Sequence, residues 1–516
     1  MRSNERRTEL IGVGLILALA AMLRLWSISY DLPYVFHPDE PAVVDVAVKI
    51  VKNGDFNPHF FHYPSLVFYV HAAGYALYYA LGRAGGAFNS LSDLSNLSSL
   101  VMGTTVAPDP AIVLIGRGIT LALGLGSVLL VYLAGRALTQ SRAVGALAAF
   151  FMAISPTFIY HSRIITPDTF VTFFALVVLY FTIRLFHEGK TWHYVAAAVA
   201  VGLTAGSKYN GVLSGILPVA AHFLRDGRRG WRDWRLYAMP LLSGLVFLLT
   251  TPYSLLDYPA FSEALAFDAT HYATGHAGME GDTVRWYLGF LWQTTTVLPL
   301  LALIQVARGL LQRSKTTALL ASFPIVYILF ISRFIVRNDR TLLPALPFLF
   351  LLAAILLVDW YRRAIRVKSA GRRWLATAAV AILVLLLVAQ PLRLSIAENA
   401  WRDGEQTLPT AANWINDNLP AGSKVAIESY GPFIDASKFT IQPFDKIIDS
   451  PPEWYVAEGY NYLIVSRARY GRYFLDPQRY AGEVAQYENI FRSFHLVNSF
   501  SSERAEIRIY RVLDES

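Results

Sequence analysis

The hydrophobic pattern of the chain is a series of apolar runs separated by short polar loops. The runs are about 18 residues or longer, which is enough for an α-helix to cross a bilayer. Only helices and closed barrels satisfy every backbone group in lipid, so the pattern predicts an all-α polytopic membrane protein. We predict about 11 transmembrane helices, at residues 10–28, 112–135, 143–160, 168–186, 192–206, 210–224, 236–252, 285–307, 316–332, 341–360 and 374–392.

One further apolar segment, residues 65–81, decides on which side of the membrane all later loops lie. If it spanned, the arginine-rich loops at residues 225–235 and 362–373 would lie outside, against the preference of Lys and Arg for the cytoplasm. If it does not span, these loops and the basic N-terminus (Arg2, Arg6 and Arg7) all lie inside. We therefore predict a juxtamembrane helix at residues 65–81, a cytoplasmic N-terminus and an external C-terminal end, in a cell (inner or plasma) membrane.

The predicted topology divides the chain into a membrane region, residues 1–392, and a soluble region, residues 393–516. The first external loop covers about residues 29–111 and contains a Ser/Asn/Leu-rich stretch at 89–99 that is typical of irregular loop. A second long external loop covers about residues 254–284. In the C-terminal region, residues 408–419 favour an amphipathic helix, and residues 424–428, 462–465 and 506–512 favour strands. This region is predicted to be a small external α/β domain.

Composition narrows the function classes. The net charge of +8 could indicate nucleic-acid binding, but the Lys and Arg residues cluster in the short loops that fix membrane orientation, so no nucleic-acid partner is predicted. The chain has no cysteine, which excludes disulfides and thiolate chemistry. Ala18-Leu19-Ala20 faintly resembles a signal-peptidase site, but the apolar run continues past it, so the first segment is interpreted as an uncleaved anchor.

Two adjacent carboxylates follow the first predicted span, in the sequence His37-Pro38-Asp39-Glu40. A loop rich in aromatic residues and histidine, Phe56 to Pro64, comes soon after. This combination suggests an acid/base site at the membrane face, with Asp39 and Glu40 as its catalytic residues. The alternative is that the two carboxylates cap the helix that follows, since acidic residues favour a first helical turn.

Other polar residues lie at helix ends on the same predicted side. Charged residues near lipid are costly, so each of them suggests a functional site. Cations there suit the release of an anionic leaving group such as a phosphate. The alternatives are an N-terminal cap for Asp168, snorkelling for Lys208, and non-specific headgroup binding for the arginines. The candidates for phosphate binding are Arg163, Lys208, Arg337 and Arg340, and those for substrate binding are His37, His59, His62, Tyr63 and Asp168.

Cofactor signals are weak. The histidines and carboxylates of the first loop include metal-ligand types, but no tight pair spacing supports a metal centre. No phosphate loop or dinucleotide fingerprint precedes a helix, so a soluble nucleotide has no recognisable binding element. No cofactor is required by this interpretation.

The order of these features resembles the GT-C membrane glycosyltransferases. The order is the acidic pair, His62-Tyr63-Pro64-Ser65-Leu66, Ser162-Arg163 followed by Asp168, Lys208-Tyr209-Asn210-Gly211, and Arg340-Thr341-Leu342-Leu343-Pro344. Within that class the chain is similar to the protein O-mannosyltransferases (glycosyltransferase family 39) and the related aminoarabinose transferases. The resemblance covers roughly residues 5–395. This chain has Tyr-Pro-Ser where the family usually has a Pro-Pro pair.

The resemblance implies a GT-C fold with juxtamembrane helices in the first external loop. It also implies inverting transfer of a sugar from a polyprenyl-phosphate donor to an acceptor hydroxyl at the external face, where protein, lipid and glycan acceptors all remain open. Asp39 corresponds to the family's presumed general base, and Glu40 to the residue that orients it or the acceptor. The rival interpretation is a lipid or glycolipid transporter or flippase, but neither inverted repeats nor broken midplane helices are evident.

Overall fold

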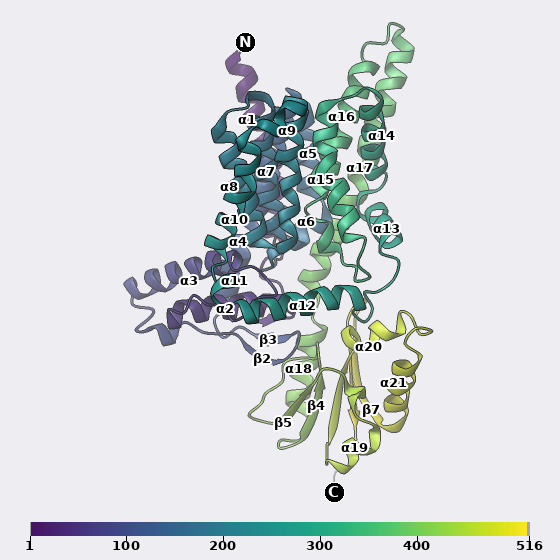
Figure 1. The fold of residues 1–516 in the computed structure, drawn as a ribbon. Coiled ribbons are helices and arrows are strands. Elements are labelled where there is room, and N and C mark those ends of the chain that lie inside the picture. The colour runs from purple at the N-terminus through teal and green to yellow at the C-terminus, as the bar shows by residue number, and fades with distance from the viewer. Residues whose placement is uncertain (1, 513–516) are drawn as a thin grey trace.

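A computed structural model describes residues 2–512 of the chain, with side chains in the first helix from Arg6 onward, so the side chain of Arg2 lies outside the described part. Most of the helices run side by side in one bundle, and a smaller domain with a β-sheet lies beyond one end of it (Figure 1). Helices α2, α3 and α12 lie across that end of the bundle, which we call the α2 end (Figure 1).

Each predicted membrane span overlaps one or two α-helices. The bundle helices are α1 (Arg2–Leu25), α4 (Pro110–Thr139), α5 (Arg142–Ile154), α6 (Pro156–His161), α7 (Pro167–Glu188), α8 (Thr191–Ser207), α9 (Ile216–Asp226), α10 (Trp234–Thr250), α13 (Thr283–Thr295), α14 (Leu298–Leu311), α15 (Lys315–Ile331), α16 (Leu346–Ala364) and α17 (Ala370–Gly404). A 3-10 segment of seven residues, Tyr209–Gly215, links α8 to α9.

Two of the predicted spans are broken. The span at 285–307 consists of α13 and α14, which meet at an angle of 109°. Thr296 between them has a φ of 57°, and Pro299 stands in the first turn of α14, where its missing N–H costs no helical hydrogen bond. The span at 143–160 is divided into α5 and α6 at Pro156, which similarly begins a new helix.

By length and composition alone, four helical segments within the described residues can cross a membrane: the helix from Arg6, α4, α7 and the stretch from Ala370; the bent pair α13–α14 makes up to five. The other predicted spans fall on shorter helices, or on α16, whose last turn carries Arg362 and Arg363. The count of about 11 spans therefore stays a prediction. The bundle core is formed by buried faces of several helices, including Leu179, Phe323 and Phe348.

The first loop between α1 and α4 is folded. It contains β1 (Tyr34–Val35), α2 (Asp39–Asn53), α3 (Leu66–Ala84), β2 (Ser98–Val101) and β3 (Thr104–Val106). Helix α3 is the segment predicted to be juxtamembrane, and it lies across the bundle end beside α2 (Figure 1). The stretch at 89–99 is less irregular than predicted, because a short 3-10 turn (Leu91–Asp93) and the start of β2 fall inside it, and β2 pairs with β3.

The C-terminal domain is a five-stranded sheet with helices. Its elements are α18 (Thr407–Asn418), β4 (Lys424–Glu428), β5 (Thr440–Phe444), α19 (Pro452–Ala457), β6 (Tyr462–Ser466), α20 (Arg467–Phe474), α21 (Ala481–Ser493), β7 (His495–Ser501) and β8 (Glu506–Arg511). The strand order is β5-β4-β6-β8-β7, parallel from β5 to β6 and antiparallel thereafter. The predicted small α/β domain is confirmed. Helix α17 continues to Gly404, past the predicted boundary at residue 393.

The first loop docks onto this domain through the turn between β2 and β3. The backbone N–H of Tyr430 donates to the carbonyl of Met102 at 2.7 Å, and Thr104 Oγ1 donates to the carbonyl of Gly431 at 2.5 Å. Gly103 has a φ of +71°, and a Cβ there would meet the Tyr430 ring at 2.2 Å. Glycine at this position therefore permits both the turn and its close contact with the domain.

Candidate functional site

Helix α2 begins at Asp39, directly after Pro38, and its first turn carries the acidic pair. In the described chain no side-chain hydrogen bond caps this helix, but both carboxylates lie in its first turn, where negative charge is favourable, so the capping alternative stands beside the catalytic one. Asp39 forms an ion pair with Arg340 and accepts a hydrogen bond from Tyr63, and its backbone N–H donates to His37 Nδ1 at 3.3 Å. Three residues predicted for the site (Tyr63, His37 and Arg340) thus surround the predicted base.

The charge state of Asp39 is set by a balance of burial and pairing. Burial by itself would raise the pKa of Asp39, but the Arg340 guanidinium, with smaller contributions from His37 and Tyr63, lowers the pKa to about 2. Asp39 is therefore an ionised proton acceptor at neutral pH. It is a weak base for as long as Arg340 stays beside it.

Glu40 points to different partners and is fully buried. Its two carboxylate oxygens accept hydrogen bonds from Arg117 Nε at 2.9 Å and Nη2 at 2.8 Å, and one of them also accepts the backbone N–H of Ile165 at 3.2 Å. Arg117 further donates to the carbonyls of Ile28 and Tyr30. Glu40 and Arg117 therefore join the end of α1, the start of α2 and the loop before α7, and they fix the first turn of α2 in place.

A second ion pair lies beside the first. Asp168, in the first turn of α7, accepts a hydrogen bond from Lys208 Nζ at 2.6 Å, and its other oxygen has no hydrogen-bond partner in the described structure. Arg340 interacts electrostatically with both Asp39 and Asp168. The cationic side chains remain accessible, since Arg340 is 25% and Lys208 16% exposed. Two carboxylates and two cations thus form one cluster at the α2 end.

His161 lies beside this cluster and contacts the residue that precedes Arg340. His161 Nε2 lies 3.0 Å from a carboxylate oxygen of Asp339, the residue before Arg340. Burial by itself would raise the pKa of the Asp339 carboxyl group. His161 and Arg340 outweigh this effect, so the pKa is lowered. This contact holds the 3-10 turn Asp339–Leu342 against the end of α6, which positions the Arg340 side chain.

The remaining predicted residues lie elsewhere. Arg163 donates to Asn399 Oδ1 at 2.5 Å and to the carbonyl of Trp26, and so it belongs to a cluster at the end of α17 rather than pairing with Asp168. Arg337 is close to Gly281 and lies 6.0 Å from the Trp286 ring centre. His59 pairs with the exposed Asp55.

His62 lies outside the Asp39 cluster and contacts another helix. Its Nδ1 lies 2.8 Å from Asp268 Oδ1 in α12 (Tyr258–Thr274), which joins the two long loops. Pairing with Asp268 raises the pKa of His62, although burial opposes the shift. His62 therefore connects loops that cover the α2 end, at a contact separate from the Asp39 pair.

Sequence reasoning missed Arg117, His161, Tyr30 and Arg402. Arg117 is a charge inside a predicted span, and this alone is a signal for a buried partner. His161 and Arg402 carry no such signal, because their partners come from distant parts of the chain. Arg402 is stacked over the rings of Tyr30 at 4.8 Å and Tyr160 at 4.3 Å.

A cavity of about 270 Å³ opens next to the cluster, between the first loop, the end of α17 and the C-terminal domain. His37 and Asp31 line one wall, Trp401 and Arg402 another, and Tyr430 the domain side. Two buried donors at its walls, the Tyr30 hydroxyl and Trp401 Nε1, have no hydrogen-bond partner within residues 2–512. A ligand in this cavity would lie against Asp31, His37 and Pro38, directly before Asp39 in the chain.

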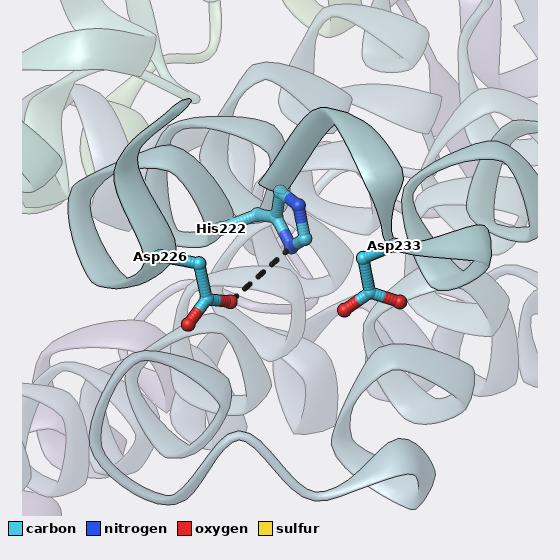
Figure 2. A group of neighbouring side chains, drawn as sticks. All are labelled: His222, Asp226 and Asp233. Atoms are coloured by element: carbon cyan, nitrogen blue, oxygen red, sulfur yellow. Dashed lines mark ion pairs between the residues drawn. The ribbon is translucent and has the colours of Figure 1, made fainter. Parts of the chain in front are cut away.

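One group of side chains in the described chain has ligand atoms close enough together to suggest a metal ion, namely His222, Asp226 and Asp233 (Figure 2). Both ring nitrogens of His222 already have protein partners, the Tyr194 hydroxyl at 2.8 Å and the Gly230 carbonyl at 3.0 Å. Both oxygens of Asp233 accept hydrogen bonds from Arg235. The group lies near the C-terminal end of α7, opposite the Asp168 end, and its contacts hold the loop between α9 and α10.

Comparisons with known proteins give matches in sequence and fold. The model of the dolichyl-phosphate-mannose-protein mannosyltransferase family matches residues 98–263. The oligosaccharyltransferase of Archaeoglobus fulgidus in the apo form aligns with a TM-score of 0.58 and 12% identity, over 90% of this chain and 70% of that chain. No curated protein sequence matches.

ArnT from Cupriavidus metallidurans bound to undecaprenyl phosphate aligns with a TM-score of 0.55 and 16% identity, over 96% of this chain and 97% of that chain. The Archaeoglobus fulgidus oligosaccharyltransferase AglB in complex with an inhibitory peptide and a dolichol-phosphate aligns with a TM-score of 0.56 and 12% identity, over 89% and 69% of the two chains. This chain is therefore a multi-pass membrane protein with the GT-C glycosyltransferase fold, and over residues 98–263 it resembles the dolichyl-phosphate-mannose-protein mannosyltransferases in sequence.

Proposed function

We propose that this protein transfers a sugar from a polyprenyl-phosphate donor to an acceptor hydroxyl at the α2 end of the bundle. The observation that carries the proposal is the cluster of Asp39, Asp168, Arg340 and Lys208, which places a carboxylate base beside two accessible cations. Of the structures with the same fold, ArnT is bound to undecaprenyl phosphate and AglB is in complex with a dolichol-phosphate. No comparison supports the transporter alternative.

The donor phosphate binds Lys208 and Arg340 in this scheme. The acceptor oxygen attacks the anomeric carbon from the side opposite the phosphate, and the bond between that carbon and the phosphate oxygen breaks. The electron pair leaves with the polyprenyl monophosphate, whose growing negative charge the two cations stabilise. The acceptor proton goes to Asp39, and the configuration at the anomeric carbon inverts.

Donor binding also changes the basicity of Asp39. While Arg340 pairs with it, the pKa of Asp39 is about 2. A phosphate that takes over the Arg340 guanidinium withdraws positive charge from Asp39, so the pKa of Asp39 rises and its proton affinity increases. In addition, the acceptor hydroxyl becomes more acidic as its bond to the anomeric carbon forms, so proton transfer occurs late. The base is therefore strengthened when the donor is in place.

We further propose that the α2 end faces the cell exterior. Arginines and lysines of the bundle loops gather at the opposite end, in the loops that join α4 to α5, α7 to α8, α9 to α10, α14 to α15 and α16 to α17 (Figure 1). By the positive-inside tendency, that end is cytoplasmic. The C-terminal domain and the Asp39 cluster then lie outside.

The proposal predicts that Lys208→Gln weakens binding of undecaprenyl phosphate by roughly 10- to 100-fold, because a hydrogen bond to a charged group contributes about 1.5–3 kcal/mol. Binding of undecaprenyl phosphate to the purified protein measures this. Lys315→Gln removes an exposed lysine at the start of α15 and is the matched control, with no change expected.

Loss of Lys208 also leaves the buried Asp168 without its partner. The double variant Lys208→Gln/Asp168→Asn removes this unpaired charge and restores folding, but it should bind the lipid phosphate as weakly as the single variant. Wild-type affinity in a folded double variant contradicts the phosphate site.

We propose that the acceptor enters through the cavity between the first loop and the C-terminal domain. Burial, opposed by Arg402 and Arg117, raises the pKa of Asp31 to about 6. Ionised Asp31 can accept a hydrogen bond from an acceptor hydroxyl, so transfer relative to donor hydrolysis is expected to fall as the pH drops through about 6. Asparagine still accepts a hydrogen bond but lacks the charge that strengthens it, so in Asp31→Asn this ratio is expected to be low, by roughly 10-fold, at every pH.

The measurement is labelled sugar transferred to membrane acceptors, divided by labelled sugar released into water. Asp403→Asn, which replaces an exposed carboxylate at the end of α17, is the control and should keep the wild-type profile.

The raised pKa of Asp31 also makes stability depend on pH, because the protonated side chain favours the folded state. This contribution is complete below about pH 4 and is lost as the pH rises through 6. Asp31→Asn is therefore expected to unfold at a higher temperature than the wild type above pH 6. If the ratio of transfer to hydrolysis still depends steeply on pH in a stable Asp31→Asn protein, Asp31 is not the titrating group and this entry route is wrong.

A further inference from the structure

The connection between α12 and α13, residues 275–282, lies between the bundle and the C-terminal domain (Figure 1). Glu280, whose side chain is only 9% exposed, accepts a hydrogen bond from the Tyr480 hydroxyl, and Arg479 Nη2 lies 3.9 Å from its other oxygen. Ala277 packs against the buried cluster of the domain that includes Tyr480. This connection is therefore anchored in the domain by a buried carboxylate as well as by apolar packing.

His276 provides a second anchor. Its Nε2 lies 2.9 Å from Arg472 Nη1 in α20. Burial and the neighbouring charge of Arg472 lower the pKa of His276 to about 4, so the neutral ring accepts a hydrogen bond from the guanidinium at neutral pH. Gly278, with a φ of +80°, lets the backbone turn against Arg472, since a Cβ there would lie 3.0 Å from that side chain.

The opposite side of the same connection contacts the segment that follows α15. The backbone N–H of Arg337 donates to the carbonyl of Met279 at 2.9 Å. Thr283 Oγ1, at the start of α13, donates to the carbonyl of Phe334 at 2.5 Å. The residues between the anchors in the domain thus also hold the backbone of the segment from Phe334 to Arg337.

This segment leads directly to Arg340, which comes three residues after Arg337. The turn that carries Arg340 is held in the bundle by the contact of Asp339 with His161. Just before the turn, the chain is held by the hydrogen bond to Met279. The bundle therefore fixes one side of the turn, and a connection anchored in the C-terminal domain fixes the other.

The domain has further attachments to the rest of the chain. Helix α17 continues into it, Arg504 pairs with Glu398 of that helix at 2.5 Å, and Tyr430 binds the carbonyl of Met102. The connection between α12 and α13 is therefore not required to keep the domain in place. Its buried Glu280 contact is better explained by what the connection holds on its other side.

We infer that the C-terminal domain positions Arg340 for the donor phosphate, with Tyr480 and Glu280 as positioning residues. The hydroxyl of Tyr480 holds Glu280, the connection holds the backbone of Arg337, and Arg340 follows. The inference rests on the proposed function, in which Arg340 binds the phosphate and pairs with the base. A displacement of about 1 Å in such a group costs up to about 100-fold in rate, so this support matters for transfer.

The first experiment measures binding of undecaprenyl phosphate to the purified full-length protein. Tyr480→Phe and Glu280→Ala are each expected to weaken binding by roughly 10-fold, the lower range for a hydrogen bond to a charged group. Glu280→Gln can still accept the Tyr480 hydroxyl, so it should stay within about 3-fold of the wild type. Tyr470→Phe is the matched control and should change nothing, because it removes a hydroxyl that donates to Glu506 in the same domain, between α20 and β8.

A double-mutant cycle separates positioning of Arg340 from a general loss of structure. Tyr480→Phe is repeated in an Asp39→Asn/Arg340→Gln protein, in which no carboxylate at position 39 is left without its partner. If Tyr480 acts through Arg340, its replacement should not weaken lipid phosphate binding any further in this background. The same loss in both backgrounds would show that Tyr480 acts by another route, and the inference is then wrong.

The remaining outcomes distinguish the inference from the proposed function. Wild-type affinity in folded Tyr480→Phe and Glu280→Ala proteins overturns the positioning role and leaves the phosphate site standing. An affinity of Glu280→Gln as low as that of Glu280→Ala also contradicts the role of the Tyr480 hydrogen bond. Wild-type affinity in the Asp39→Asn/Arg340→Gln protein shows instead that Arg340 does not bind the phosphate, which overturns that part of the proposed function and the inference with it.

Discussion

Asp39→Asn is expected to lower sugar transfer by roughly 10²- to 10⁴-fold, the usual contribution of a positioned general base. Asparagine keeps the size of the side chain but cannot take up the acceptor proton. Binding of undecaprenyl phosphate should persist or become tighter, because Arg340 loses its competing carboxylate. The measurement is the transfer rate from a polyprenyl-phosphate sugar at saturating donor, together with lipid phosphate affinity.

The matched control for this variant is Asp55→Asn. Asp55 lies in the same loop and is exposed. It pairs with His59 and accepts the backbone N–H of Asn57, away from the Asp39 cluster, so its replacement should leave transfer unchanged. Full transfer by a folded Asp39→Asn protein would show that another group takes the proton, and Asp168 is then the next carboxylate to replace. Loss of both transfer and lipid binding would place Asp39 in the binding of the donor rather than in catalysis.

The apolar runs and the acidic pair could be found from the sequence because their physical constraints are local. A helix in lipid satisfies its backbone groups with its own hydrogen bonds and is covered by apolar side chains. Its length is therefore visible as the length of an apolar run in the sequence. The juxtamembrane position of α3 followed from the charges of distant loops, which a single topology must satisfy together. The helix after the acidic pair was visible through the alternative that both carboxylates favour its first turn, which is where they lie.

The pairing of the charges could not be predicted. Asp39 and Arg340 are 301 residues apart, and only the packing of the helix ends brings them together. Asp168 pairs with Lys208 rather than with the nearer Arg163, because the turn after α6 directs Arg163 toward Asn399.

Two strands of the C-terminal domain were also missed. Both β5, which contains Pro443, and β7 are edge strands without a buried residue, so neither has a clear hydrophobic pattern. The pattern marks central strands such as β6, which is buried throughout.

Arg117→Leu is expected to destabilise the protein by about 3–5 kcal/mol, because it leaves the charge of Glu40 buried without a partner. The carbonyls of Ile28 and Tyr30 also lose their donor. A large fall in the thermal unfolding temperature of the purified protein would show this. The control is Arg492→Ala, which removes an exposed ion pair with Glu488 and should cost less than about 1 kcal/mol.

A double variant separates stability from catalysis at this pair. Replacing a buried ion pair with apolar residues of similar size is often neutral, so Arg117→Leu/Glu40→Met should recover most of the lost stability. Transfer should nevertheless stay low, because Glu40 also accepts the Ile165 N–H and fixes the helical turn that carries Asp39. A stable double variant with wild-type transfer would reduce Glu40 to a purely structural residue, and Asp39 would then be held in place by Arg340, Tyr63 and His37 alone.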